Sequence, residues 1–478
     1  MNSAALAVVA LGSATQVALY LRSFGATHRT DGFIAAFAVY SLVVVLAQIL
    51  RTTAVPLLSG PAPALTGAAY GWAIAVIAAV AAVACEALAA PLADLVAGAS
   101  GAAGRTIATA SLRVMAPAMG LQIVGAGLAV AGAVRGRLVA VALAYMASSV
   151  AGLTAFFLLR GSASERVLAW TMLVASLVLV AGLLLADGVA ATTRRPPGAS
   201  VVGRACLALM RSTPLPACFV LMYPITLALA PGRPPGRITL FGLAFTACSY
   251  LAGFTGQALS MVDAVALAQM DAGAVDERRA VVTRAFRYSL LVAVPGLGVA
   301  AVAGGPIVDA LLPHSSTGSH GYFGADVLLL VPWLVATLGL WALLPAVLAD
   351  PGRFEGRLVV AAVALVALHI AAELVGRAIA GFDGLIVAVT VAPAAFVAAS
   401  LRVAVPTAGR ELLRNAAVIV AIGAVSFGAC SLGARAIADG GALAGVAAAA
   451  AGALVYAALA TVAFPDAARS VLRLAGQG

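Results

Sequence analysis

The sequence predicts an all-α polytopic membrane protein with about fourteen transmembrane helices: two parallel six-helix lobes plus two C-terminal helices. Apolar residues make up 63% of the 478-residue chain and charged residues 10%, far from the composition of soluble domains. The apolar runs are each about 20 residues long and do not alternate with polar residues, which indicates helices that cross a bilayer. A third observation is that arginines gather in the short segments between these runs.

The apolar windows mark the expected helices in chain order: 3–22, 33–50, 66–90, 107–133, 138–159, 167–187, 205–230, 238–266, 288–312, 326–349, 358–380, 384–404, 412–437 and 441–464. We interpret the first window as a retained helix and not as a signal peptide, because it has no basic start and leads directly into the second. With the N-terminus inside, 17 arginines fall in inner loops and 9 in outer loops. The positive-inside rule therefore predicts a plasma-membrane protein with both termini in the cytoplasm.

An internal repeat predicts the two lobes. Three segments return in the same order, at offsets of 215, 215 and 220 positions: 90–98 as 305–313, 116–128 as 331–343, and 136–144 as 356–364. An offset of six spans gives both halves the same orientation, as in several transporter folds. The expected organisation is an N-terminal lobe (1–190), a cytoplasmic linker (191–204), a C-terminal lobe (205–405), and two extra helices with a cytoplasmic tail (406–478).

Composition also excludes several classes of function. All 28 cationic residues are arginine, which favours a GC-rich genome such as that of an actinobacterium; their scatter through loops argues against a nucleic-acid partner. The cysteines lie in apolar runs without metal-ligand spacing, so we expect no metal site: Cys85, Cys206, Cys218, Cys248 and Cys430. Without a P-loop lysine, a G-x-S-x-G or an H-E-x-x-H motif, the chain is expected to be no enzyme and to need no cofactor.

Charge is concentrated in the stretch "SFGATHRTDGFIAAF" at 23–37. One interpretation is local: Gly25 allows a turn, Thr30 caps the second helix, and Asp31 complements the dipole of that helix. Arg22 and Arg29 then lie at the membrane interface. A compatible second interpretation is that this hairpin lines the mouth of a substrate cavity.

Two segments carry a family resemblance. "LRSFGATHRTDGFIAAFAVYSLVVVLAQ" resembles the first hairpin of the MurJ/MviN family of lipid II flippases, in the multidrug/oligosaccharidyl-lipid/polysaccharide (MOP) superfamily. "DERRAVVTRAFRYSLLVAVPGLGVAAVAGGPIVDALLP" at 276–313 is similar to the cytoplasmic amphipathic segment and ninth helix of that family. The resemblance implies alternating access of two lobes, a lipid-linked or amphipathic anionic substrate, and a groove for a lipid tail beside the last two helices. Membrane lipids and cell-wall synthesis proteins are the partners it implies.

The chain departs from that family where the family carries cavity arginines, because the corresponding positions lie near Ala10, Gln16 and Val44 and the eighth helix holds no cation at 245–249. Amides donate weaker hydrogen bonds to phosphate than arginine does. In the eighth helix, 249, 253, 257, 260 and 263 form one small or polar stripe, which equally fits helix packing. The candidate cavity residues are Gln16, Arg22, Arg29, Asp31, Gln48, Arg51, Arg211, Gln257, Ser260 and Asp263.

Ionisable residues inside the bilayer are candidates for ion coupling. His369, Glu373 and Arg377 stand at i, i+4 and i+8 on one face of the eleventh helix, either as a proton or cation relay or as a self-neutralising strip near the outer interface. Asp263 is the fourth candidate. Segment 271–287 is expected to form an interfacial helix at the cytoplasmic face.

Three functions fit these observations. The first is a flippase for lipid-linked oligosaccharides or peptidoglycan precursors. The second is a proton- or sodium-coupled exporter of drugs or metabolites, which needs an acidic residue such as Asp263 or Glu373 deep in a lobe. The third is a non-transporting scaffold for envelope synthesis, which is compatible with the missing cavity arginines.

Overall fold

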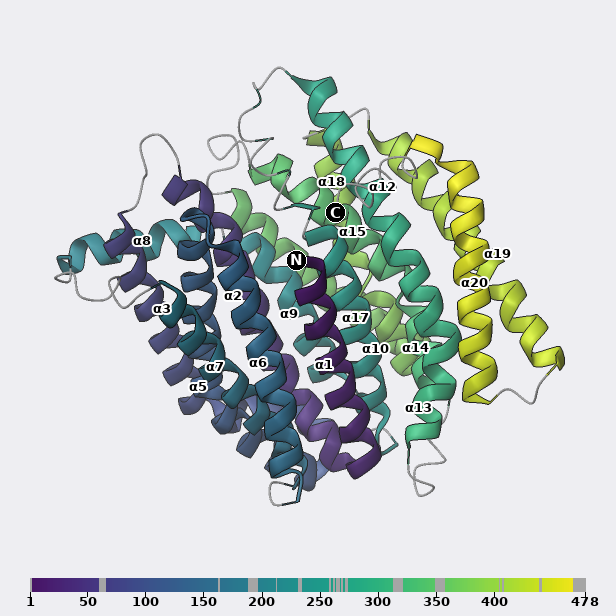
Figure 1. The fold of residues 1–478 in the computed structure, drawn as a ribbon, viewed down its shortest axis with the longest axis horizontal. Coiled ribbons are helices and arrows are strands. Elements are labelled where there is room, and N and C mark those ends of the chain that lie inside the picture. The colour runs from purple at the N-terminus through teal and green to yellow at the C-terminus, as the bar shows by residue number, and fades with distance from the viewer. Residues whose placement is uncertain are drawn as a thin grey trace. The chain divides into compact units, whose positions relative to one another are not determined.

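The computed structural model describes residues 2–59, 66–161, 164–187, 197–211, 213–230, 234–257, 259, 260, 263, 267, 270, 274–312, 321–348, 357–403, 405, 408–437 and 441–466. Within these residues there is no β-strand, so the expected all-α class is confirmed (Figure 1). The helices are α1 (Asn2–Phe24), α2 (His28–Ser59), α3 (Gly67–Ala87), α4 (Ala89–Ala97), α5 (Gly101–Val134), α6 (Leu138–Leu159), α7 (Val167–Asp187), α8 (Ala199–Arg211), α9 (Pro214–Leu229), α10 (Arg237–Ala252), α12 (Val275–Val299), α13 (Gly305–Leu311), α14 (Tyr322–Leu329), α15 (Val331–Leu348), α17 (Arg357–Ala388), α18 (Val391–Val403), α19 (Gly409–Ile437) and α20 (Ala442–Ala463). Short 3₁₀ turns η1 (Gly98–Ser100) and η2 (Ser164–Arg166) and π-helical turns η4 (Gly253–Gln257) and η5 (Ala300–Gly304) join some of them.

The helices have the length and composition of membrane spans. Among the described residues, 9 helices are long and apolar enough to cross a bilayer, or 10 if α14 and α15, which meet at a 44° bend, form one span. Shorter apolar helices α9, α10 and α18 stand where the sequence predicted the seventh, eighth and twelfth spans. The chain is therefore a multi-pass membrane protein.

Two compact units divide the chain, and each is described by itself. Unit 1 comprises Met1–Thr239 and Leu358–Val366, and unit 2 comprises Leu240–Arg357 and Ala367–Gly478. The chain passes from unit 1 to unit 2 inside α10, after its first three residues. The lobe boundaries expected from the repeat stay a prediction.

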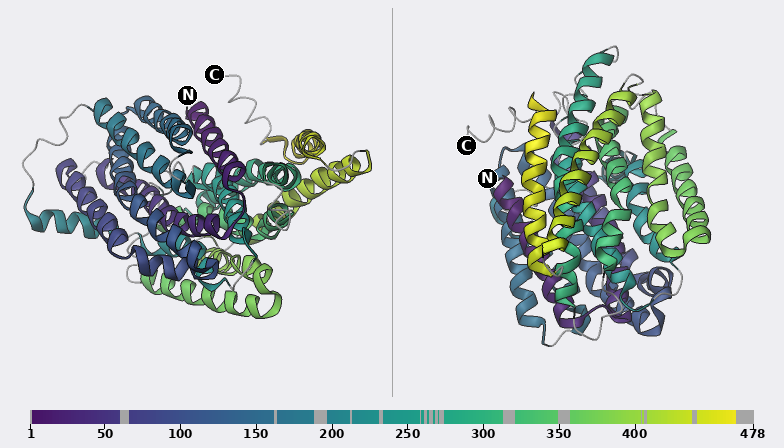
Figure 2. Two further views of the ribbon diagram at one scale, coloured as in Figure 1. Left: turned by 90° about the horizontal axis from the view of Figure 1, so that it is seen from below. Right: turned by 90° about the vertical axis from the view of Figure 1, so that its right-hand side faces the viewer.

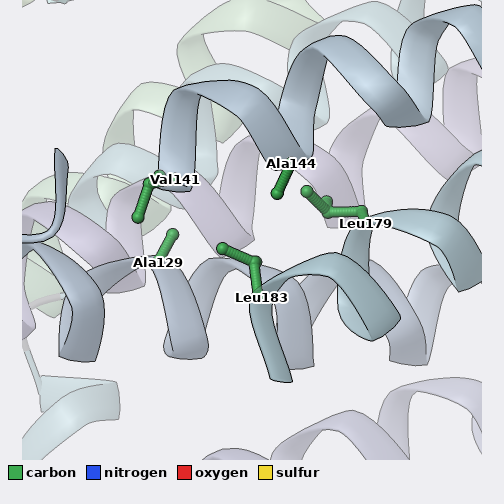
Figure 3. Packing of buried hydrophobic residues seen from close by; sticks show 5 residues of the cluster. All are labelled: Ala129, Val141, Ala144, Leu179 and Leu183. Carbon is green, nitrogen blue, oxygen red and sulfur yellow. The ribbon is translucent and has the colours of Figure 1, made fainter. Parts of the chain in front are cut away.

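In unit 1, α5 packs against α2, α3, α4 and α7. Its C-terminal half meets α6 and α7 through small and branched apolar side chains, which point toward one another in Figure 3. This cluster is Ala129 of α5, Val141 and Ala144 of α6, and Leu179 and Leu183 of α7. Small residues allow helices to approach closely where lipid offers no hydrophobic driving force for their association.

α2 and α5 approach each other closely at Gly32 and Gly104. A Cβ atom at Gly32 would lie 2.1 Å from the backbone oxygen of Gly104, and one at Gly104 would lie 2.8 Å from the backbone oxygen of His28. Both positions therefore require glycine. This crossing sets the position of the first turn of α2, which carries Asp31.

In unit 2, α12 packs against α15, α19 and α20. α19 and α20 pack against each other, and they run side by side in the right-hand view of Figure 2. Segment 271–287 was expected to form an interfacial helix; from Val275 onward it is the first part of α12, which continues into the ninth span. Val282 and Phe286, on its apolar side, are 0% and 4% exposed.

α17 folds back on itself. Ala380 and Gly381 leave the helical conformation, and Gly381 has a φ of +62°. On either side of this turn, a Cβ at Gly384 would lie within 1.9 Å of the backbone oxygen of Gly376. The two spans predicted at 358–380 and 384–404 are therefore separate arms of a tight hairpin.

The seventh span begins later than the window 205–230 predicted. α8 ends at Arg211, and α9 begins at Pro214 with Thr213 as its N-cap. Proline is well placed in the first turn of a helix, where its missing N–H leaves no bond within the helix unmade. Pro214 thus starts α9.

The repeated segments occupy comparable elements in the two halves. Segments 90–98 and 305–313 fall largely in the short helices α4 and α13, each of which follows a long span. Segments 116–128 and 331–343 lie in α5 and α15, and segments 136–144 and 356–364 open α6 and α17. The order of elements thus agrees with the repeat seen in the sequence.

We expect Gly32→Ala to lower the free energy of unfolding by about 1–3 kcal/mol, because the new methyl group meets backbone atoms that cannot rotate away. Gly71→Ala in α3 is the matched control, since nothing lies within 4 Å of a Cβ there. Thermal unfolding of both variants in detergent measures the difference. Equal melting temperatures for the two would contradict the tight crossing of α2 and α5.

Candidate functional site

The turn between α1 and α2 is closed by its own backbone. α1 ends at Phe24, and Gly25 takes the left-handed conformation with a φ of +66°. The backbone N–H of Gly25 donates to the oxygen of Leu21 at 2.8 Å, which satisfies a carbonyl at the helix end. The sequence interpretation of Gly25 as a turn residue is confirmed.

α2 begins with a reciprocal cap formed by two threonines. The backbone N–H of Thr27 donates to Oγ1 of Thr30 at 2.8 Å, and the N–H of Thr30 donates to Oγ1 of Thr27 at 3.2 Å. This arrangement is a capping box with Thr27 as the N-cap. The expectation that Thr30 is the N-cap is wrong by one turn, because the pair satisfies two N–H groups and extends the helix back to His28.

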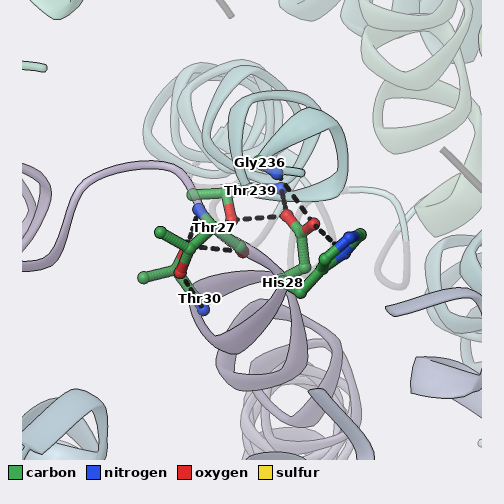
Figure 4. Close-up of polar contacts among 6 residues, drawn as sticks. Thr27, His28, Thr30, Gly236 and Thr239 are labelled. Atoms are coloured by element: carbon green, nitrogen blue, oxygen red, sulfur yellow. Dashed lines mark hydrogen bonds and ion pairs between the residues drawn. The ribbon is translucent and has the colours of Figure 1, made fainter. Parts of the chain in front are cut away.

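Asp31 binds another helix (Figure 4). Its Oδ2 accepts from the backbone N–H of Gly236 at 2.9 Å, and its Oδ1 accepts from the N–H of Thr239 at 2.7 Å. Oδ1 also accepts from the Thr239 hydroxyl at 2.7 Å. Asp31 is 2% exposed and Thr239 0%. We call Asp31, Gly236 and Thr239 the α10 clamp.

The clamp replaces a cap that α10 does not supply. Gly236 precedes the helix with a φ of +82°, and a Cβ there would lie 2.3 Å from the Cβ of Ala26. Only glycine fits, and glycine has no side chain to accept from the first N–H groups of the helix. The carboxylate of Asp31 makes the bond to Thr239 that an N-cap side chain would make, and its charge complements the helix dipole.

The clamp has two further polar neighbours in the same turn. Oγ1 of Thr30, which is fully buried, lies 3.1 Å from Oγ1 of Thr239. Nδ1 of His28 lies 4.0 Å from Oδ2 of Asp31. Thr30 therefore contributes to both its own capping box and the contact with α10.

Arg29 connects the same turn to the segment before α7. Its Nε lies 2.8 Å from Oε1 of Glu165, and Arg29 remains 52% exposed. The hydroxyl of Tyr20 donates to the backbone oxygen of Glu165 at 3.1 Å. Arg22, in the last turn of α1, is exposed. The charge in the opening stretch thus joins three connecting segments of unit 1.

The other cavity candidates of unit 1 lie elsewhere. Gln16 is half-buried in α1. Its side-chain amide nitrogen lies 3.0 Å from the point that a Cβ atom would occupy if Gly152 of α6 were replaced by a larger residue. Gln48 and Arg51 lie in α2, and Arg211 ends α8. Their side chains, and that of Gln257 in η4, lie outside the described residues.

In unit 2, Asp263 is paired. The Arg284 guanidinium, on α12, lies 3.7 Å from Oδ1 of Asp263, and the Asp263 side chain is 12% exposed against 56% for Arg284. Ser260 is buried as well, at 6%. The sequence singled out Asp263 as an unexpected acid, whereas its partner 21 positions later was not identified.

His369 and Glu373 form a pair inside α17. Nε2 of His369 lies 3.3 Å from Oε1 of Glu373, and both side chains are 0% exposed. Arg377, one turn further, is exposed. The helix carries a narrow buried stripe at 362, 365, 369 and 373, and the pair belongs to that stripe rather than to the exposed surface.

Four residues of these sites were missed by sequence reasoning: Gly236, Thr239, Glu165 and Arg284. One signal was present in the sequence "RPPGRIT", within which the helix begins. No Ser, Thr, Asp or Asn stands at the N-cap position, so the first N–H groups of the helix need an acceptor from elsewhere. Glu165 and Arg284 carry no comparable local signal. In the part of the chain that the structure describes, no three His, Cys, Asp or Glu side chains come together as a metal site would require.

The fold is shared with solved structures of a lipid II flippase and of multidrug transporters. The structure is similar to the lipid II flippase MurJ in an inward closed conformation, with a TM-score of 0.68 and 14% identity over 97% of this chain and 99% of that one. It is also similar to an inward-facing MATE multidrug transporter of the MOP superfamily (TM-score 0.56, 14% identity, 84% and 94% covered) and to a MATE transporter in the straight conformation (0.53, 13%, 86% and 93%). No family model and no curated protein sequence matches the chain. The likeness establishes the fold.

We expect Asp31→Asn to destabilise the protein by about 1–3 kcal/mol, because an amide has one acceptor oxygen and would turn an NH₂ toward a backbone N–H. A residue that only complemented the dipole of its own helix would tolerate this change. Asp94→Asn in α4 is the control, since Asp94 is 66% exposed. Thermal unfolding and hydrogen exchange at the amides of Gly236 and Thr239 measure the effect. Unchanged protection of those two amides would contradict the clamp.

Proposed function

We propose that the chain is a flippase of the plasma membrane that moves a lipid-linked oligosaccharide or peptidoglycan precursor by alternating access, with both termini in the cytoplasm. The observation that carries this proposal is the extent of the likeness to MurJ, which covers 97% of this chain, whereas the likeness to the inward-facing MATE transporter covers 84%. The first hairpin, on which the family resemblance rests, supports it. Cell-wall synthesis proteins are the partners that such a flippase would meet.

The proposed substrate is amphipathic and anionic, because the cationic groups near the first hairpin are accessible. Arg22 is exposed, and Arg29 keeps about half of its surface while it contacts Glu165. Arginine is suited to phosphate through its paired N–H donors. The expected cavity arginines of the MurJ family are absent, so the substrate we propose is the class of lipid-linked anions rather than lipid II itself.

Flipping is tested in vesicles with the purified protein and a fluorescent polyprenyl-pyrophosphate sugar. We expect Arg22→Gln to slow flipping about two- to fivefold, the loss that an exposed charge contact produces, and salt to slow the wild type more than the variant. Arg160→Gln is the control, because Arg160 is exposed and lies over the ring of Phe157. Wild-type protein that flips no faster than empty vesicles would contradict a flippase and favour the scaffold.

A second candidate function is an exporter coupled to protons or sodium, and one specific observation favours it. His369 and Glu373 lie 3.3 Å apart with no exposed surface. A carboxylate and an imidazole that are both shielded from water can hold a proton or a small cation between them. Removing such groups from water costs free energy, which a shared proton, a bound cation or an ion pair offsets. In this proposal the pair is the coupling site, with Asp263 and Arg377 as further members.

We expect Glu373→Gln to abolish proton or sodium movement that accompanies transport, while substrate exchange without a gradient continues, because the amide cannot carry the charge. A dye inside the vesicles reports the pH change, and matched sodium gradients test the alternative ion. Glu277→Gln, at an exposed position in the first turn of α12, serves as the control. Coupled ion movement that survives in Glu373→Gln would rule out this pair as the coupling site.

A further inference from the structure

α8 lies apart from the spans that precede and follow it in the chain. In Figure 1 it runs across the direction of α3, α5 and α7, and it remains beside them as a projecting helix in Figure 2. It packs against α3 and α2, and its residues Ala205 and Leu209 are both fully buried. The Sγ of Cys206 lies 3.8 Å from the backbone oxygen of Ala73. One side of α8 is thus fixed to unit 1.

The opposite side of α8 exposes two kinds of residue. Leu207 is 53% exposed and Met210 is 41% exposed. Arg204 is exposed as well. Because residues three apart are displaced by about 60° around a helix, Arg204 lies on one flank of the exposed face and Met210 on the other, with Leu207 between them. The helix therefore has a docked side, an exposed apolar sector and a basic flank.

The depth of α8 in the membrane follows from its contact with α3. α3 is a span of 21 residues that begins at Gly67, so Ala73 lies about 9 Å along its axis, at 1.5 Å per residue. Helix α7 before α8 is also a span of bilayer length. A helix held at this level meets the boundary between acyl chains and headgroups, where exposed leucine and methionine side chains are favourable.

We propose that α8 lies in the membrane interface and binds an anionic phospholipid, with Leu207 and Met210 among the acyl chains and Arg204 on the headgroup phosphate. Arginine pairs with phosphate through two N–H donors, and a cation near an anionic leaflet gains further attraction. The lipid is the occupant because α8 packs against α3, a helix of bilayer length, and so lies beside the lipid that surrounds that span. The inference concerns a lipid site outside the proposed transport path and does not depend on the substrate.

The orientation of α8 is tested with spin labels at single cysteines in vesicles of phosphatidylcholine and phosphatidylglycerol. Cys206 and Cys430, the two half-buried native cysteines, are first changed to serine. Labels at Leu207→Cys and Met210→Cys should collide more with oxygen than with a water-soluble nickel chelate, as a label at Leu177→Cys in α7 should. A label at Arg204→Cys should show the reverse. Preferential collision of the 207 and 210 labels with nickel would overturn the proposal.

The lipid preference is tested by thermal unfolding of the full chain in neutral detergent with added phosphatidylglycerol or phosphatidylcholine. We expect phosphatidylglycerol to stabilise the wild type, and Arg204→Gln to bind it about fivefold more weakly, the loss of one cation at an anionic surface. Arg204→Lys should retain most of the effect. The control Arg160→Gln should behave as the wild type. An unchanged response of Arg204→Gln, or an equal loss in Arg160→Gln, would overturn the assignment of Arg204.

Discussion

The first turn of α10 depends on a carboxylate that comes from 205 positions earlier in the chain. A helix that starts in or near a bilayer must find partners for its first N–H groups, because water is scarce and each unpaired group costs several kcal/mol. Gly236 cannot supply an acceptor, and the contact with Ala26 prevents a larger residue there. Asp31 meets that requirement. α10 begins in unit 1 and continues into unit 2.

The hairpin that carries Asp31 is itself fixed on several sides. The glycine crossing of α2 and α5 sets the position of the α2 start, and the contact of Arg29 with Glu165 holds the segment before α7. Capping and cavity lining were compatible interpretations of this charged stretch. The structure adds a third role, in which the acid serves a distant helix. Arg22 and Arg29 of the hairpin remain exposed.

The fold of this protein does not determine which substrate it binds. The MOP fold hosts flippases and transporters, so the fold by itself does not choose a substrate. The chain lacks the expected cavity arginines and instead buries a histidine beside a glutamate in α17. The flippase proposal draws on the exposed arginines of the first hairpin, and the exporter proposal draws on the buried pair in α17.

Hydropathy by itself determined the membrane class and the positions of most spans, because the bilayer imposes one length and one composition on every crossing helix. The two predicted windows at 358–380 and 384–404 fall on either side of the turn at Gly381 in α17. The predicted window 205–230 runs across the break between α8 and α9, because both helices are apolar. Tertiary structure alone decided that Asp31 binds Gly236 and Thr239, that Glu165 meets Arg29, and that Arg284 meets Asp263. These pairs are distant in the chain, and a local pattern carries no information about which distant donor a buried carboxylate will meet.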